Sequence, residues 1–434
     1  MSATSVRGRS RLLKSTLSLI AGLTCTAVWS GCASGEDPGD AADATAVSVE
    51  DSSGVEIVTN RGDGWGPGDA WRLEPDLQVG ELDGPLAFGR ITWVGPGPDG
   101  GMLVLDGQSH LVHVFDSVGT SVRSFGGEGE GPGEFRRPAA VTLLRDGRLA
   151  VAEGFPPVLH WLTLAGDYLS STRLPSARDE VGTRTAGAFG IWQVTSAGRV
   201  FVQVQVIDPG ADDGEMPVVL MEVDPAGEVS PDTIADWTWR AGFGDEAIRV
   251  FEPVHTWMPG SDGMVAVSAG FPYEIEWHDP ADGLQRLVRR VVEGAPVTDR
   301  HRRRAIEDMR EGMAAGGASE GMVDDMLNRV EFESTVPDVL RVWVSEPDGG
   351  LWIGVHDPDL FAIEPGGPIS GWTNALDVFE SDGRYLGRIP LPEGFTLRVV
   401  TEDALYGIWE DDLEVPFARR YRLVRPASEE KARD

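Results

Sequence analysis

The sequence predicts an all-β protein, a six-bladed β-propeller of four-stranded antiparallel blades. Three observations carry this prediction: a composition rich in turn residues, a pair of glycine turns that recurs along the chain, and a tryptophan at a fixed distance from the first turn. Of 434 residues, 55 are Gly and 29 are Pro, while 41% are hydrophobic. That composition is typical of many short strands joined by tight turns, because a disordered chain would lack the apolar fraction.

The repeated turns define the units. A first turn ends at Gly100, Gly147, Gly198, Gly263 and Gly349, and a second turn ends at Gly119, Gly166, Gly227, Gly283 and Gly383. Glycine after Asp, Ala or Val supplies the positive φ angle that tight hairpins require. Strand-like runs flank each turn, so a unit contains four strands and two hairpins, which is the organisation of a propeller blade.

A tryptophan register supports the same units. Trp192, Trp257 and Trp343 lie six residues before their first-turn glycine, Val141 occupies the same place, and Trp93 lies one residue earlier. These positions fall on the innermost strand of each blade. We expect the side chains to pack between neighbouring sheets as core; the alternative is an aromatic ligand channel.

The ring needs a strand from the N-terminal side. First strands are expected near residues 90–94, 139–144, 189–194, 254–258, 339–344 and 396–401. The sixth unit lacks a second glycine turn and a fourth strand. Val55–Thr59 or Trp71–Val79 can supply that strand, and closure would remove exposed sheet edges.

Residues 1–31 predict a lipoprotein-type signal peptide. Residues 7–14 are basic, Leu12–Val28 is mostly apolar, and Ser30-Gly31-Cys32 resembles the end of a bacterial lipobox. We therefore expect lipidation of Cys32 and attachment to the membrane through lipid at the bacterial cell envelope; a soluble periplasmic or secreted protein is the alternative. Residues 32–53 read as a flexible acidic tether, residues 54–425 as the propeller and residues 426–434 as a disordered tail.

The segment at 125–135, FGGEGEGPGEF, followed by Pro138 and RDGRLAVAE at 145–153, resembles the NHL-repeat class of six-bladed propellers. Together with the signal peptide, the chain is similar to uncharacterised bacterial lipoproteins of that fold. The resemblance implies a fold and leaves the function open.

Residues 298–336 break the strand pattern between blades 4 and 5. Apolar residues recur at helical spacing on both sides of Gly316-Gly317, and Thr298 and Ser319 are suitable N-caps. We predict a helical hairpin that lies over the loops joining the second and third strands of the blades.

Acidic and basic residues near those loops are the candidate ligand-binding residues. They are Asp208, Asp212, Asp213, Glu215, His356, Asp357, Asp359, Glu410, Asp411 and Asp412 from the loops, with Arg300, Arg302 and Arg303 from the insertion. The acids could hold a cation or basic ligand, or simply bond their own turns. The arginines could pair with the acidic loops, remain solvated, or bind an anionic ligand.

The charge and the missing motifs limit the function. A net charge of −33 argues against nucleic-acid binding, because such a surface repels phosphate. We expect a monomeric binding or scaffolding protein with an unknown protein or small-molecule ligand, no predicted cofactor and no assigned catalytic residue. The alternative is a metal-dependent hydrolase or lyase, similar to lactonases or esterases, with calcium or another divalent cation in the central tunnel.

Overall fold

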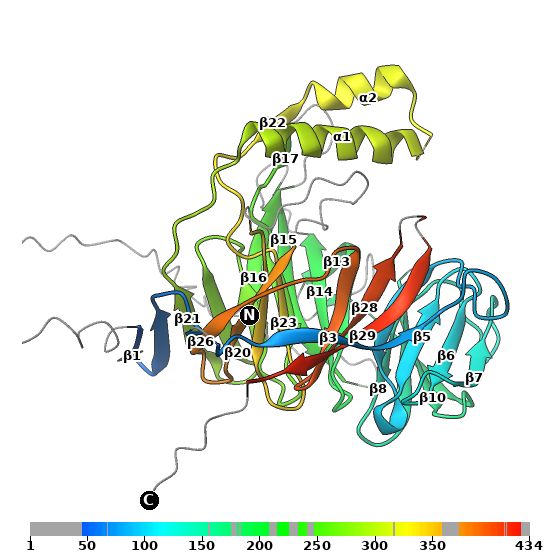
Figure 1. Ribbon diagram of the computed structural model, residues 1–434. Helices are drawn as coiled ribbons and strands as arrows, with labels where there is room; N and C mark the ends of the chain where they lie inside the picture. Colours follow the sequence, from blue (N-terminus) through cyan, green and yellow to red (C-terminus); the bar gives the residue numbers. More distant parts are fainter. Residues whose placement is uncertain are drawn as a thin grey trace, which may run out of the picture. The chain divides into compact units, whose positions relative to one another are not determined.

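The computed structural model describes residues 46–66, 68–154, 157–174, 180–181, 184–207, 215–224, 233–240, 247–315, 317–357, 373–411, 413 and 415–426. Within these residues the chain forms the predicted six-bladed β-propeller (Figure 1). No helix in the described stretches combines the length and the apolar character needed to cross a membrane.

The blades follow chain order, each starting with its innermost strand. Blade 1 contains β4 (Ile91–Pro96), η1 (Pro98–Gly100), β5 (Met102–Asp106), β6 (Leu111–Phe115) and β7 (Ser121–Gly126). Blade 2 contains β8 (Pro138–Leu143), β9 (Arg148–Glu153), β10 (Val158–Thr163) and β11 (Tyr168–Arg173). Blade 3 contains β13 (Arg184–Val194), β14 (Val200–Ile207), β15 (Glu215–Val223) and β16 (Ala235–Arg240), with β12 (Glu180–Val181) beside β13.

Blade 4 contains β18 (Thr256–Pro259), β19 (Val265–Ser268), β20 (Glu274–Asp279) and β21 (Gly283–Arg290). Blade 5 contains β23 (Arg341–Val344), β24 (Leu351–Val355), β25 (Ala375–Phe379) and β26 (Tyr385–Pro390). Blade 6 contains β27 (Phe395–Val400), β28 (Ala404–Glu410), β29 (Pro416–Val424) and β3 (Arg72–Val79). All six predicted first strands are confirmed.

The glycine turns are confirmed by their backbone angles. Nine of the predicted turn glycines lie in the described residues, and all nine have φ between 72° and 93°. A residue with a side chain rarely adopts this conformation, which explains why the turns carry glycine. We call the end of the sheets with these turns the turn end. The opposite end, where the loops after Asp106, Glu153, His356 and Glu410 lie, is the loop end.

Ring closure uses the second of the two predicted strands. β3 pairs antiparallel with β29, with Leu77 opposite Arg420. The other segment forms β2 (Val55–Asn60), which extends blade 4 by pairing parallel with β21. β1 (Val47–Ser52) pairs with β2, so the end of the predicted flexible tether is a strand. The acidic residues of β1 remain in contact with solvent, because β1 is an edge strand with mostly exposed side chains.

The core consists of apolar clusters between neighbouring blades. In the described residues one cluster lies between each pair of adjacent blades, and the cluster with Phe115 and Tyr406 joins blade 6 to blade 1. Trp257 and Trp343 are 6% and 4% exposed and pack in such clusters, as predicted. The ring is therefore closed by packing as well as by hydrogen bonds.

The predicted insertion is a helical hairpin of α1 (Asp299–Ala315) and α2 (Glu320–Leu327). The Ser319 side chain caps α2 by accepting the Met322 N–H at 3.4 Å. After α2, β22 (Val330–Phe332) pairs parallel with β17 (Ile248–Val250), and Phe251, Val297 and Ala305 share an apolar cluster. Figure 1 shows α1 and α2 side by side, next to this strand pair.

Candidate functional site

The candidate residues at the loop end are described in part. Glu215 begins β15, His356 and Asp357 follow β24, Glu410 ends β28 with Asp411 after it, and Arg300, Arg302 and Arg303 lie in the first turns of α1. Asp208, Asp212, Asp213, Asp359, Asp412 and Cys32 lie outside the described residues. The structure therefore gives the positions of the first group only.

His356 is buried where α1 meets blade 5. Its Nε2 lies 3.2 Å from Nε2 of His301, and the two side chains are 6% and 3% exposed. At this distance one nitrogen carries a proton and the other accepts it, so two fully protonated rings cannot keep the contact. Burial lowers the pKa of His301, which favours its neutral form. The contact attaches the insertion to blade 5.

Asp357 belongs to an ion-pair network rather than to a cluster with His356 alone. The Arg388 side chain donates to Asp357 Oδ2 from Nη1 at 3.1 Å and to Asp377 Oδ1 from Nε at 2.7 Å. Asp377 is completely buried. Asp357 is thus the outer end of a buried network that the sequence did not reveal.

Asp377 is the centre of that network. Arg290 donates to it at 3.0 Å, Tyr273 at 2.9 Å and Tyr385 at 3.2 Å, in addition to Arg388. Burial, then the negative charge of Asp377, raises the pKa of Tyr273 well above its usual value, so its hydroxyl remains a donor. All five side chains come from blades 4 and 5. The network therefore connects two blades.

Arginines of the basic run in α1 form ion pairs with acids of the same helix. Arg302 lies 3.3 Å from Asp299, and Arg304 lies 2.8 Å from Asp308. Arg303 is exposed to solvent. For Arg302 and Arg304 the partner is therefore an acid of the insertion, not an acidic loop of the propeller.

Two acids at the loop end support their own turns. Asp106 accepts the Gln108 N–H at 2.9 Å and the Ser109 hydroxyl at 2.7 Å. Asp411 Oδ1 accepts the N–H groups of Leu413 and Val415, both at 2.9 Å. These bonds give Asp411 a structural role in its turn.

A cavity of about 140 Å³ lies in the central channel, toward the turn end. All six innermost strands contribute to its wall, which includes Trp93, Trp192 and Trp343 together with Arg398 of β27. The prediction that the tryptophan register is core alone is therefore incomplete. An innermost strand has a sheet on either side and the channel in front of it. The same register position can consequently face either environment.

One arginine, Arg398, lines this cavity, and a second, Arg341, lies over the ring of Trp343 in its wall. Arg398 donates from Nε to the Thr92 carbonyl at 3.3 Å, and no carboxylate of the described residues forms an ion pair with it. Burial and then the charge of Arg341 lower the pKa of Arg398 to about 10, against an opposite effect of Glu410. The guanidinium of Arg341 lies 5.2 Å from the ring centre of Trp343. Arg341 is exposed to solvent, and partial desolvation by the surrounding protein lowers its pKa as well.

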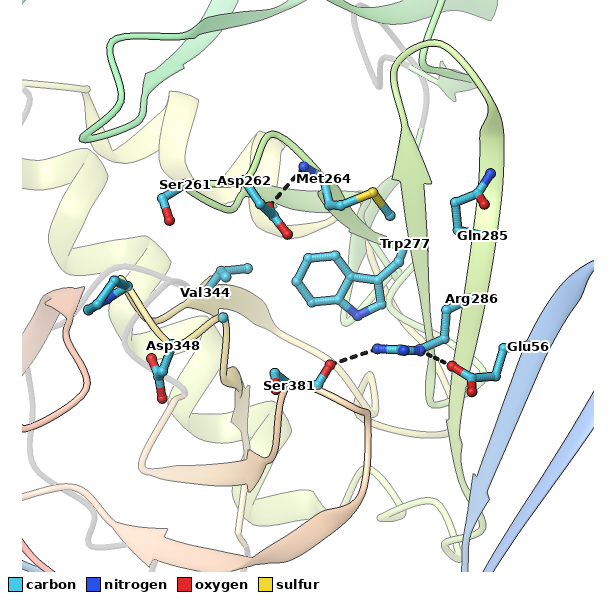
Figure 2. Close-up of a pocket in the computed structure, with 12 residues that line it drawn as sticks. Glu56, Ser261, Asp262, Met264, Trp277, Gln285, Arg286, Val344, Asp348 and Ser381 are labelled. Carbon is cyan, nitrogen blue, oxygen red and sulfur yellow. Dashed lines mark hydrogen bonds and ion pairs between the residues drawn. The ribbon is translucent and has the colours of Figure 1, made fainter.

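A second cavity, of about 300 Å³, lies between the first turns of blades 4 and 5. Figure 2 shows Trp277 beside it, with Asp262 and Met264 on one side and Arg286 on the other. Arg286 forms an ion pair with Glu56 and donates to the Ser381 carbonyl at 2.6 Å. The basic group of this cavity therefore joins blade 4 to β2 and to blade 5.

The described side chains that line the channel cavity do not form a ligand set for a divalent cation. Calcium and zinc take carboxylate, carbonyl, imidazole or thiolate ligands. Among the described residues, the charged ones that line the channel cavity are Arg398 and Glu346, so the wall offers a single carboxylate. In the part of the chain that the structure describes, no three His, Cys, Asp or Glu side chains gather as a metal site.

Comparisons with known proteins add structural likenesses only. No family model and no curated protein matches the chain. Among solved structures, the chain is similar to a protein from Bacteroides fragilis assigned as exported, with 11% identity, a TM-score of 0.47, and coverage of 85% of this chain and 99% of that one.

A member of the DUF4221 family from Bacteroides vulgatus has 10% identity and a TM-score of 0.48, over 83% of this chain and 100% of that one. Virginiamycin B lyase from Staphylococcus aureus has 7% identity and a TM-score of 0.40, over 82% of this chain and 100% of that one. Likenesses at these values say nothing about what this chain binds or converts.

Sequence reasoning missed three residues that the structure makes prominent. His301 is spaced four residues from Ala305, so it falls on the buried face of α1. Asp377 interrupts the apolar run ALDVF of β25, and Arg398 interrupts FTLRVV of β27. A charge inside an otherwise apolar strand was the available signal in both cases.

Proposed function

We propose that this protein is a non-catalytic binding propeller, exported and held at the bacterial cell envelope by lipid on Cys32. Its loop end, with the helical insertion, would meet a protein partner or ligand. The supporting observation is how the insertion is attached. The ring closes through β3 and β29 without it, yet a strand pair, an apolar cluster and the His301–His356 contact attach it. The insertion is firmly attached although ring closure does not need it, and this supports a role for it in binding at the surface.

The exposed face of the insertion has the chemistry of a partner surface. Met322 of α2 is 57% exposed, and Arg303 of α1 is exposed as well. Met and Arg are enriched in protein interfaces, where apolar side chains lie among polar ones. The acids of the neighbouring loops would add complementary charge for a basic partner.

The metal-dependent hydrolase or lyase has less support. That alternative needs a cation in the channel, and Arg398 and Arg341 would repel one. Metal analysis of the purified protein, with thermal-shift measurements in added calcium and zinc, tests this point. A stoichiometric metal that raises the melting temperature would overturn the non-catalytic assignment.

The partner surface is tested by capture from solubilised envelopes. The full-length protein serves as bait beside Met322→Asp and Arg303→Glu, which change exposed residues of the insertion. Val118→Asp is the matched control, because Val118 is 79% exposed in a turn-end hairpin. We expect each insertion variant to lose a partner that the wild type and the control retain. Capture that is equal in all four proteins would refute a role for the insertion.

A further inference from the structure

We propose that the channel cavity binds a small organic anion: one carboxylate on a flat apolar body, held by Arg398 and Arg341 beside the tryptophans of the wall. The proposal concerns a different site from the partner surface at the loop end. Either can fail without the other.

The first argument is charge. The chain has a net charge of −33, and acids outnumber basic residues 70 to 37. Even so, neither Arg341 nor Arg398 forms an ion pair with a described carboxylate. Arg398 is partly withdrawn from water, which is costly for a charge without a partner, and proteins normally supply the counter-ion. A ligand carboxylate would supply it here.

The second argument is position. Arg398 and Trp343 line the cavity together, and the guanidinium of Arg341 lies over the Trp343 ring, 5.2 Å from its centre. Nε of Arg398 is used by the Thr92 carbonyl, which fixes the side chain and leaves its terminal nitrogens as donors. Arginine presents paired donors that match the two oxygens of a carboxylate.

The third argument is shape. A volume of about 140 Å³ is several times the roughly 30 Å³ share of one water. Trp93, Trp192 and Trp343 give the wall aromatic faces, which suit a flat apolar body. The cavity is therefore suited to a small molecule rather than to a single ion.

The fourth argument sets the number of charges on the ligand. Glu346 lines the cavity at the β23–β24 turn, where it accepts the Ser196 N–H at 3.4 Å. Its carboxylate would repel a second negative group at that end. A ligand with one carboxylate, directed toward the arginines, fits both ends of the cavity.

Calorimetric titration of the detergent-solubilised full-length protein tests this site, with benzoate, benzamide and benzylammonium as probes. We expect benzoate to bind at least about tenfold more tightly than benzamide, and benzylammonium to give no measurable heat. Arg398→Gln and Arg341→Gln should each weaken benzoate binding about tenfold or more and leave benzamide unchanged. Arg123→Gln, a change of an exposed arginine on the outer strand β7, should leave benzoate binding intact.

Three results would overturn the proposal: no measurable benzoate binding, equal affinity for benzoate and benzamide, or equal benzoate affinity in wild type and both channel variants. Circular dichroism and thermal melting establish that each variant is folded. If Arg398→Gln does not fold, Arg341→Gln decides the matter, because its side chain is solvent-exposed.

Discussion

Two pairs of arginines on the strands of this propeller differ in what faces them. Arg290 and Arg388 share the buried carboxylate of Asp377 between blades 4 and 5. Arg341 and Arg398 lie at the channel without an ion-pair partner among the described residues. The same residue type is thus neutralised in one place and left unpaired in the other.

The difference separates a structural task from a binding task. A paired arginine stabilises the contact between two blades once its desolvation is offset by a carboxylate and additional hydrogen bonds. An unpaired arginine reduces stability, and that reduction is typical of sites prepared for a ligand. The predictions below test this contrast, starting with the largest expected effect.

Asp377→Asn should destabilise the protein by about 3–5 kcal/mol, because it removes the negative charge that two largely buried guanidiniums share. Urea unfolding followed by tryptophan fluorescence measures the loss. Asp382→Asn is the control, since Asp382 pairs with Arg384 in an exposed turn and should change stability by less than about 1 kcal/mol. A loss below about 1 kcal/mol for Asp377→Asn would contradict the structural assignment of the network.

Arg398→Met should change stability in the opposite direction. Replacing an unpaired, partly buried charge by an apolar side chain of similar length should stabilise the protein by roughly 1–2 kcal/mol, with loss of benzoate binding. Arg388→Met provides the matched comparison and should destabilise, because Arg388 bonds both Asp377 and Asp357. If both substitutions destabilise equally, the two pairs of arginines do not differ as proposed.

The smallest expected effect is a pH dependence at the insertion. Burial lowers the pKa of His301, so the unfolded chain binds its proton more readily than the folded one. Stability from this residue is complete above about pH 6.5 and is lost as pH falls further, by on the order of 1 kcal/mol.

Melting curves between pH 7 and pH 5 measure that slope. Burial lowers the pKa of His113 and His255 in the same direction, so His301→Gln should reduce the slope without abolishing it. His278→Gln, on β20 of blade 4, is the control substitution outside the insertion. An unchanged slope in His301→Gln would show that the His301–His356 contact does not contribute to the pH dependence of stability.

The parts of the fold that could be predicted from the sequence are those that local chemistry determines. A glycine at φ near 80° and the strands beside it can be read from neighbouring residues, which explains why the turns and blade order were predicted correctly. The choice between two closing strands could not be made, because both segments alternate suitably and only distant partners distinguish them.

The site is harder to predict, since its residues meet across large sequence separations. Asp377 finds Arg290, which is 87 residues away, and Arg398 finds the Thr92 carbonyl at a separation of 306. No periodicity connects such pairs. The sequence also cannot tell whether an innermost-strand tryptophan turns to the channel or to a neighbouring sheet, so Trp192 and Trp257 look alike until the ring is assembled.

The closing strand has a consequence for the order of folding. Arg420 of β29 bonds Asp76 of β3 across 344 residues of chain, whereas each hairpin within a blade pairs close neighbours. Long loops must be closed before such distant contacts form, which makes them slow. We therefore expect β3 to remain unpaired during folding until blade 6 has formed. Pulsed hydrogen-exchange labelling should show protection of β3 and β29 after that of β5 and β6, with completion of the ring as the final kinetic step.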